Sequence, residues 1–216
     1  DYRLTIYNDE QFLKRDGSWK DVDLRLAETQ GRTIEPKNSK IDVRFDDRIS
    51  SRVPFMSVEG SDGDAIDFRF AGTQTKDGLQ KIEERTADTN DNQIIYKDIH
   101  PGVDVRHVVM NEEVKEDIIL NQKNMDIEKF IYRIHTKLDV GLDGAGNILF
   151  KDPRDGEVKY TMPAPVMSDS SFDARSGLSR ESRDIRYELV KGEDGFTLEL
   201  IPSKEWLSDE DTKYPV

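Results

Sequence analysis

Two alternating runs of β-branched residues within positions 103–120 constrain the fold of this chain more than any other stretch. A polar corner at Asn111 and Glu112 separates the runs, which is typical of an antiparallel hairpin. Folding the runs back on each other pairs apolar residues with apolar ones and charges with opposite charges. The predicted pairs are Val103 with Leu120, Val105 with Ile118, His107 with Glu116 and Val109 with Val114 on one face, and Arg106 with Asp117 and Val108 with Lys115 on the other.

A slip of one residue in this hairpin would place valines opposite Lys115 and Asp117 and turn one whole face of the strand over. The sequence therefore predicts a single register. The corner is open to two interpretations. A two-residue type I′ turn favours Gly where Glu112 stands, whereas a four-residue loop from Met110 to Glu113 keeps the same partners opposed.

The balance of apolar and charged residues favours antiparallel β-structure. Of the 216 residues, 35% are hydrophobic and 36% are charged, so a core must come from short alternating segments with one solvated face each. A folded chain of this length buries roughly 70% of its unfolded surface, which suffices for one large domain or two small ones. We therefore expect an all-β fold of antiparallel β-sandwich type with many short strands.

Further strands are expected where apolar residues alternate or form short runs between turn residues. These segments are residues 2–7, 12–13, 19–26, 41–45, 54–58, 65–70, 94–96, 130–135, 148–150, 158–160, 185–189 and 196–200. Hairpin turns are expected at residues 15–18, 59–63 and 191–195, and Ser203 is a predicted N-cap for one short helical turn. Polar connections are expected at residues 30–40, 73–78 and 87–92, and residues 79–85 fit either a strand or a short helix.

The most polar connection, at residues 87–92, is the expected boundary if the chain is divided. We interpret residues 1–216 as one all-β module cut from a larger protein, because there is no initiator Met and the chain stops within a strand-like segment. A division into lobes at residues 1–88 and 93–216 is left open.

The charge of the chain bears on its partners and location. A formal net charge of -13 and a pI near 4.8 disfavour attraction to nucleic acid or to an anionic bilayer, so neither partner is expected. The absence of cysteine excludes disulfides and thiolate metal sites. No apolar run is long enough to cross a membrane, and the first residues carry no signal-peptide pattern.

The inward-facing pair of His107 and Glu116 is the most suggestive candidate for chemistry. A carboxylate beside an imidazole on an apolar face could tune either group for proton transfer. The simpler interpretation is a satisfied polar pair in or beside the core. We favour it, because the sequence places no nucleophile or second carboxylate nearby, and acid-base catalysis needs such a set.

No metal site or cofactor is predicted. Residues 88–92 begin like a calcium loop, but Gln93 stands where an EF-hand needs Gly, and Ile99 stands where it needs a bidentate Glu. A solvated turn is the better interpretation. His100, His107 and His135 lack the spacing of a helical zinc pair.

Three aromatic residues could form a platform on which a sugar stacks if they were exposed, namely Trp19, Tyr160 and Trp206. Packing in the core or at a sheet edge is the simpler interpretation for aromatic residues in strand patterns. Acidic residues are abundant, so a pair of glycosidase carboxylates is also compatible with the sequence, but their separation in space is not visible in it.

Several motifs occur in a specific order along nearly the whole chain: DGSWKDVD at 16–23, VKEDIIL at 114–120, FIYRI at 130–134, MPAPVMSDS at 162–170, WLSD at 206–209 and YPV at 214–216. In this order the chain resembles the region ahead of the repeats in bacterial wall-associated and Rhs/YD-repeat proteins. His107 departs from the resemblance, because an aromatic Tyr is more usual there. The chain also holds no YD repeats and no toxin domain.

The resemblance implies a secreted, extracellular or cell-wall-associated bacterial location and a non-catalytic β-module upstream of YD repeats, which in such proteins often carry a C-terminal toxin. The implied partners are the neighbouring YD-repeat domains of the same polypeptide. We therefore expect a structural or presentation module and not an enzyme. A module that binds cell-wall glycan or another surface ligand is the alternative, and a glycan-active enzyme is the weaker one.

Overall fold

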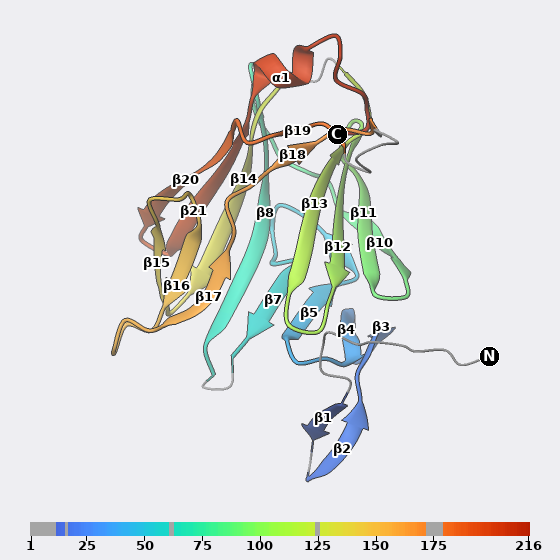
Figure 1. Cartoon of the computed structure of the whole chain (residues 1–216), viewed down its shortest axis with the longest axis vertical. Coiled ribbons are helices and arrows are strands. Elements are labelled where there is room, and N and C mark those ends of the chain that lie inside the picture. Colours follow the sequence, from blue (N-terminus) through green and yellow to red (C-terminus); the bar gives the residue numbers. More distant parts are fainter. Residues whose placement is uncertain (1–11, 16, 61–62, 124–125, 172–178) are drawn as a thin grey trace, which may run out of the picture.

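The structure is a computed structural model that describes residues 12–15, 17–60, 63–123, 126–171 and 179–216. Strands make up most of the described chain, and the elements pair antiparallel throughout (Figure 1). The predicted all-β, sandwich-type fold is confirmed. The strand predicted at residues 2–7 lies outside the described residues.

The larger sheet runs through most of the chain. Its strand order is β20 (Ile185–Gly192), β21 (Gly195–Pro202), β14 (Ile127–Thr136), β8 (Ala65–Thr75), β7 (Met56–Glu59), β5 (Asp42–Asp46), β4 (Thr33–Asn38) and β3 (Asp23–Glu28). The short strand β9 (Gly78–Gln80) pairs with the far end of β8. The strands predicted around residues 41–45, 65–70, 130–135 and 185–200 all lie in this sheet.

The second sheet packs against part of the first. Its strand order is β13 (Val114–Leu120), β12 (Val103–Val109), β11 (Gln93–His100), β10 (Arg85–Asn90) and β6 (Arg48–Ile49). Aromatic rings join the two layers: the Phe55 ring lies 6.0 Å from that of Tyr96 in β11 and 6.5 Å from that of Tyr132 in β14. The core therefore lies between the two sheets, as a sandwich requires.

Smaller elements complete the fold. They are the hairpin of β1 (Phe12–Arg15) and β2 (Ser18–Asp21), the meander of β15 (Asp139–Leu142), β16 (Ile148–Lys151) and β17 (Val158–Met162), the pair of β18 (Met167–Ser168) and β19 (Glu181–Ser182), and helix α1 (Lys204–Ser208). The meander packs on the larger sheet through Phe150, whose ring centroid lies 6.3 Å from that of Phe68. Ser203 caps α1 by accepting a hydrogen bond from the backbone N–H of Trp206, as predicted.

The hairpin of β12 and β13 has the predicted register at every pair. The turn is the four-residue alternative, because β12 ends at Val109, β13 begins at Val114, and the Met110 N–H donates to the Glu113 carbonyl. Along β12 every second side chain is fully buried, beginning with Val103. The alternation read from the sequence thus sets both the pairing and the buried face.

Two predicted connections are strands. Residues 33–38 form β4 although they include Pro36, because β4 pairs with β5 only at Thr33 and Ile34, so the missing N–H of Pro36 removes no bond on that side. Residues 85–90 form β10, whose side chains are mostly solvated, so its polar composition is compatible with a strand near a sheet edge. The turn predicted at 73–78 begins later, because β8 continues to Thr75.

The expected boundary at residues 87–92 falls on the hairpin that joins β10 and β11 inside the second sheet. The same sheet also includes β6, which comes from the first part of the chain. A cut between residues 88 and 93 would therefore separate two paired strands.

Candidate functional site

His107 occupies the inner face of β12, where the alternation of the strand places it between Val105 and Val109. Its side chain is 0% exposed. Its ring centroid lies 5.3 Å from that of Phe45 in β5 and 5.5 Å from that of Phe55, which precedes β7. The imidazole therefore packs against two aromatic rings from the side of the larger sheet. The register of the hairpin then brings Glu116 directly opposite.

Glu116 joins the two sheets through its carboxylate. One oxygen, Oε2, lies 2.8 Å from Nε2 of His107, and the other, Oε1, accepts a hydrogen bond of 3.0 Å from the Tyr132 hydroxyl of β14. The Glu116 side chain is 29% exposed, so water also reaches the carboxylate. Sequence reasoning paired His107 with Glu116 but missed Tyr132, since no local pattern connects β13 with β14.

The geometry of this polar cluster, meaning His107, Glu116 and Tyr132, indicates which groups donate and which accept. Burial, and then the nearby Glu116 carboxylate, raise the pKa of Tyr132 well above its ordinary value, so the phenol stays neutral and donates. The Nδ1 atom of His107 is buried and has no hydrogen-bond partner among the described residues. A proton on Nε2 directed at Glu116 is the tautomer that leaves no buried N–H without an acceptor. This arrangement fixes two donors on one acceptor across the sandwich.

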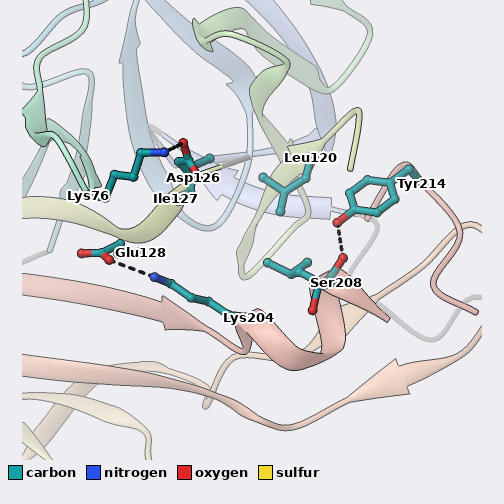
Figure 2. A pocket seen from close by; sticks show the side chains of 9 residues that line it. Lys76, Leu120, Asp126, Ile127, Glu128, Lys204, Ser208 and Tyr214 are labelled. Carbon is teal, nitrogen blue, oxygen red and sulfur yellow. Dashed lines mark hydrogen bonds and ion pairs between the residues drawn. The ribbon is translucent and has the colours of Figure 1, made fainter. Parts of the chain in front are cut away.

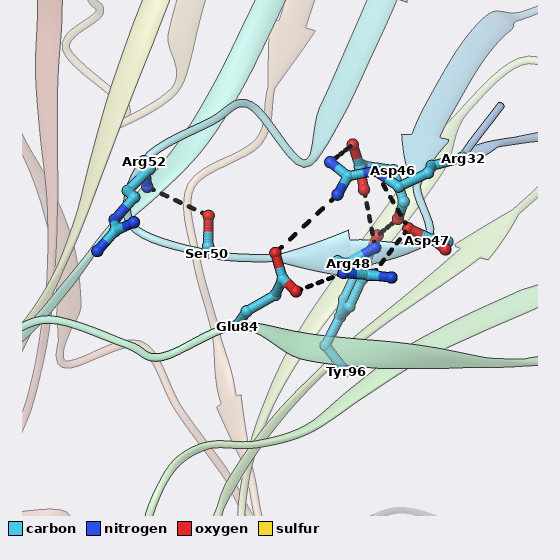
Figure 3. A network of polar contacts seen from close by, with 8 residues as sticks. All are labelled: Arg32, Asp46, Asp47, Arg48, Ser50, Arg52, Glu84 and Tyr96. Carbon is cyan, nitrogen blue, oxygen red and sulfur yellow. Dashed lines mark hydrogen bonds and ion pairs between the residues drawn. The ribbon is translucent and has the colours of Figure 1, made fainter.

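A second polar network, which sequence reasoning missed, lies where β5 passes into β6 (Figure 3). Arg32 is 2.9 Å from the Asp46 carboxylate, and Arg48 is 2.6 Å from that of Glu84. The buried Tyr96 hydroxyl donates a 2.7 Å hydrogen bond to the Asp46 carbonyl. Burial, followed by a hydrogen bond with Asp46, raises the pKa of Asp47. The run Asp46, Asp47, Arg48 was the available sequence signal. The two ion pairs join the turn before β4 to the end of β5, and β6 to the residue that precedes β10.

A pocket of about 370 Å³ lies at the end of the sandwich near α1 (Figure 2). It is lined by Lys76, Leu120, Asp126, Ile127, Glu128, Lys204, Leu207, Ser208 and Tyr214. Its charged groups are already paired: Lys76 with Asp126 at 2.7 Å and Lys204 with Glu128 at 2.9 Å. The Tyr214 hydroxyl donates to the Leu207 carbonyl at 2.8 Å.

The structure does not bring the three candidate platform aromatics together. Trp19 is 70% exposed on β2, Tyr160 is half-buried in β17, and Trp206 is half-buried in α1 beneath the Arg180 guanidinium. Figure 1 shows β2 and α1 at opposite ends of the long axis of the molecule. A single sugar-stacking row cannot include both tryptophans in this arrangement.

The three histidines considered for metal binding lie on three different strands: His100 on β11, His107 on β12 and His135 on β14. Residues 88–92 belong to the β10–β11 hairpin, in which Asp91 has a φ of 54° and its carbonyl accepts from the Leu26 N–H. Within the described parts of the chain, no group of three or more His, Cys, Asp or Glu side chains is arranged to hold a metal ion.

The fold and these clusters define a class: an all-β segment of sandwich type whose polar groups brace one sheet against the other. No helix within the described residues has the length and apolar character needed to cross a membrane.

The amino-acid sequence of the chain is similar to those of several bacterial proteins. The chain is 29% identical over 220 residues to the "tRNA nuclease WapA" of Bacillus subtilis (strain 168), an alignment that covers 100% of this chain and 9% of that protein. It is 29% identical over 219 residues to the "tRNA(Glu)-specific nuclease WapA" of Bacillus subtilis subsp. natto, with the same coverage. It is 34% identical over 94 residues to a "Wall-associated protein" of Geobacillus stearothermophilus, covering 44% of this chain and 36% of that protein. No protein-family model and no solved structure matches the chain.

These relatives confirm the predicted cell-wall-associated location. They contradict the prediction that the protein is not an enzyme, because the two WapA relatives named above, which align over the whole chain, are named tRNA nucleases. The chain spans only 9% of the length of each of those two relatives.

Proposed function

We propose that this chain is a structural β-sandwich module of a large wall-associated protein, in which it holds and presents neighbouring parts of the same polypeptide. The observation that carries the proposal is the alignment of all of this chain with 9% of each of two WapA proteins. A segment that recurs whole within much longer proteins is expected to fold as a unit with its own core, and the two packed sheets supply such a core.

For the whole polypeptide we propose tRNA nuclease activity, which the names of its relatives support. The formal net charge of this chain, -13, has the same sign as the phosphates of tRNA. Contacts that release counter-ions from tRNA need clustered Lys and Arg, so we place tRNA contact elsewhere in the polypeptide. The isolated chain is then expected to leave the gel mobility of tRNA unchanged at about 0.15 M ionic strength.

The neighbouring parts that we propose as partners are YD-repeat domains, which the order of the sequence motifs supports. The alternative of a glycan-binding module lacks comparable support, because the three aromatics that could stack on a sugar lie on separate elements.

The proposal is tested in the full-length protein with two matched substitutions. Val105→Asp places a carboxylate at a position that is 0% exposed between the two sheets, whereas Val190→Asp makes the same change at a position that is 57% exposed on β20. We expect Val105→Asp to remove intact protein from the cell-wall fraction and Val190→Asp to leave its amount unchanged, because only the first buries an unpaired charge.

Wall fractions are quantified by immunoblot, and the purified full-length protein is incubated with tRNA. Intact Val105→Asp protein at the wild-type amount in the wall would contradict a structural role for this module. Full-length protein that leaves tRNA uncut would contradict the nuclease assignment.

A further inference from the structure

Among the described residues, β13 is the edge strand of the second sheet, and no strand pairs with its outer side. In the described part of the chain, β13 pairs along its length only with β12 and lies at the end of its sheet. The Asn121 N–H donates to the Gly102 carbonyl on the β12 side, whereas the N–H and C=O of Leu120 point away from β12. Since bonding directions alternate along an antiparallel strand, Ile118 and Glu116 also direct their N–H and C=O groups outward.

Val216 is hydrogen-bonded to Leu120, the last residue of β13, on this outer edge. The Leu120 N–H donates to the Val216 carbonyl at 2.7 Å, and the Val216 N–H donates to the Leu120 carbonyl at 3.0 Å. Two residues that exchange both bonds form the hydrogen-bonded pair of an antiparallel ladder. The direction of the chain at Val216 therefore leads along β13 toward Val114.

The surface beside this edge is apolar and only half covered. Val114 and Ile118 on β13 are half-buried, and so are Tyr187 and Leu189 on β20 of the opposite sheet. Tyr132 of β14 reaches Glu116 of β13, so β14 faces β13, and the larger sheet continues past β14 by two further strands, β21 and β20.

We propose that the polypeptide continuing from Val216 in the longer protein adds a strand to the β13 edge, antiparallel to β13. Its first, third and fifth residues lie opposite Ile119, Asp117 and Lys115, and its second and fourth lie opposite Ile118 and Glu116. The second and fourth side chains face the larger sheet, where Tyr187 and Leu189 favour apolar groups. The inference deepens the proposed function, on which it rests, by giving the junction between this module and the next segment.

Backbone hydrogen exchange measures the added strand without any substitution. The 216-residue chain is compared with the chain continued by the native residues that follow Val216. We expect exchange of the Ile118 and Glu116 amides to slow at least about tenfold in the longer chain. The Asp117 and Ile119 amides, which already point toward β12, serve as internal controls and should change little. Equal exchange of Ile118 and Glu116 in both chains would overturn the strand.

An engineered disulfide tests the register between β13 and the added strand. The chain contains no cysteine of its own that could compete in this experiment. In the continued chain, Lys115→Cys is combined with a cysteine at either the fifth or the fourth position after Val216. In the proposed register Lys115 and the fifth position form a non-hydrogen-bonded pair with Cα atoms about 4.5 Å apart, which lies within the range of about 4.4–6.8 Å that a disulfide spans, whereas adjacent positions point to opposite faces. We expect oxidation to close the intramolecular bond with the fifth position and not with the fourth.

Equal closure at both positions would show a tethered but unpaired tail and would overturn the proposal, and so would no closure at either. A disulfide-linked dimer of Lys115→Cys would show that β13 pairs with a second copy, which also overturns it. If the strand fails these tests while Val105→Asp still removes the protein from the wall fraction, the module's proposed function stands without the strand.

Discussion

Replacing the acceptor of the polar cluster should cost far more stability than replacing one of its donors, although the acceptor is the more exposed residue. Glu116→Leu leaves two donors without an acceptor: the hydroxyl of Tyr132, a residue that is 4% exposed, and the Nε2–H of His107, whose side chain is 0% exposed. Each buried donor left unsatisfied costs about 1–3 kcal/mol, so the expected loss is about 2–6 kcal/mol. Leucine is a better replacement than alanine for this test, because its larger side chain keeps out water that could otherwise accept hydrogen bonds from the two donors.

Tyr132→Phe removes a donor instead. Its ring contact with Phe70, at a centroid distance of 5.0 Å, can be kept, and Glu116 at 29% exposure can take a water in place of the hydroxyl. The expected cost is about 1 kcal/mol, the net value of one hydrogen bond. The loss in free energy of unfolding should therefore be at least about twice as large for Glu116→Leu as for Tyr132→Phe.

Urea unfolding followed by fluorescence gives both values, with an unchanged slope confirming that the same transition is compared. Glu116→Gln is the matched control, because it keeps the length of the side chain and one carbonyl acceptor, so its cost should lie below that of Glu116→Leu. If Glu116→Leu cost no more than Tyr132→Phe, the carboxylate would not be the acceptor that satisfies the two buried donors.

Two further substitutions test the β13 face and the last hairpin. Burial raises the pKa of Asp117, but hydrogen bonds from Lys115 and Arg106 outweigh burial and hold it below its ordinary value, so its stabilisation is present above pH ~3.9 and is lost as pH falls further. Asp117→Asn should therefore lower the free energy of unfolding, measured by urea unfolding, by about 1 kcal/mol at pH ~7 and change it little at pH ~2; an equal effect at both pH values would exclude the charge as the cause. Gly195→Ala should cost more than about 2 kcal/mol, because φ is +117° and the new Cβ would meet the backbone of β14, whereas Gly17→Ala, with φ +79° and open space, should cost only about 1 kcal/mol; similar melting temperatures for the two would contradict this.

The sequence predicts every pair of the β12 and β13 hairpin, although it leaves the type of turn open, because the pairing is encoded locally by side chains that alternate with a period of two. It does not predict β4 and β10, because a strand with a solvated face near a sheet edge has the composition of a loop, and Pro36 adds to that appearance. The contact of Tyr132 with Glu116 joins strands of different sheets, so it depends on how the sheets pack and leaves no periodic signal. The same holds for Arg32, whose partner Asp46 lies on a neighbouring strand.

The charged centre of β13 explains how one edge can accept a strand from its own polypeptide and still discourage pairing between copies. Lys115, Glu116 and Asp117 occupy the middle of the strand, and charges on an edge strand oppose association with other chains. A segment joined at Val216 meets this edge at an effective concentration on the order of millimolar, which a separate molecule does not reach. Since Val216 has already formed two hydrogen bonds with Leu120, each further residue adds to an existing ladder. The same charges therefore select the tethered strand over a second copy.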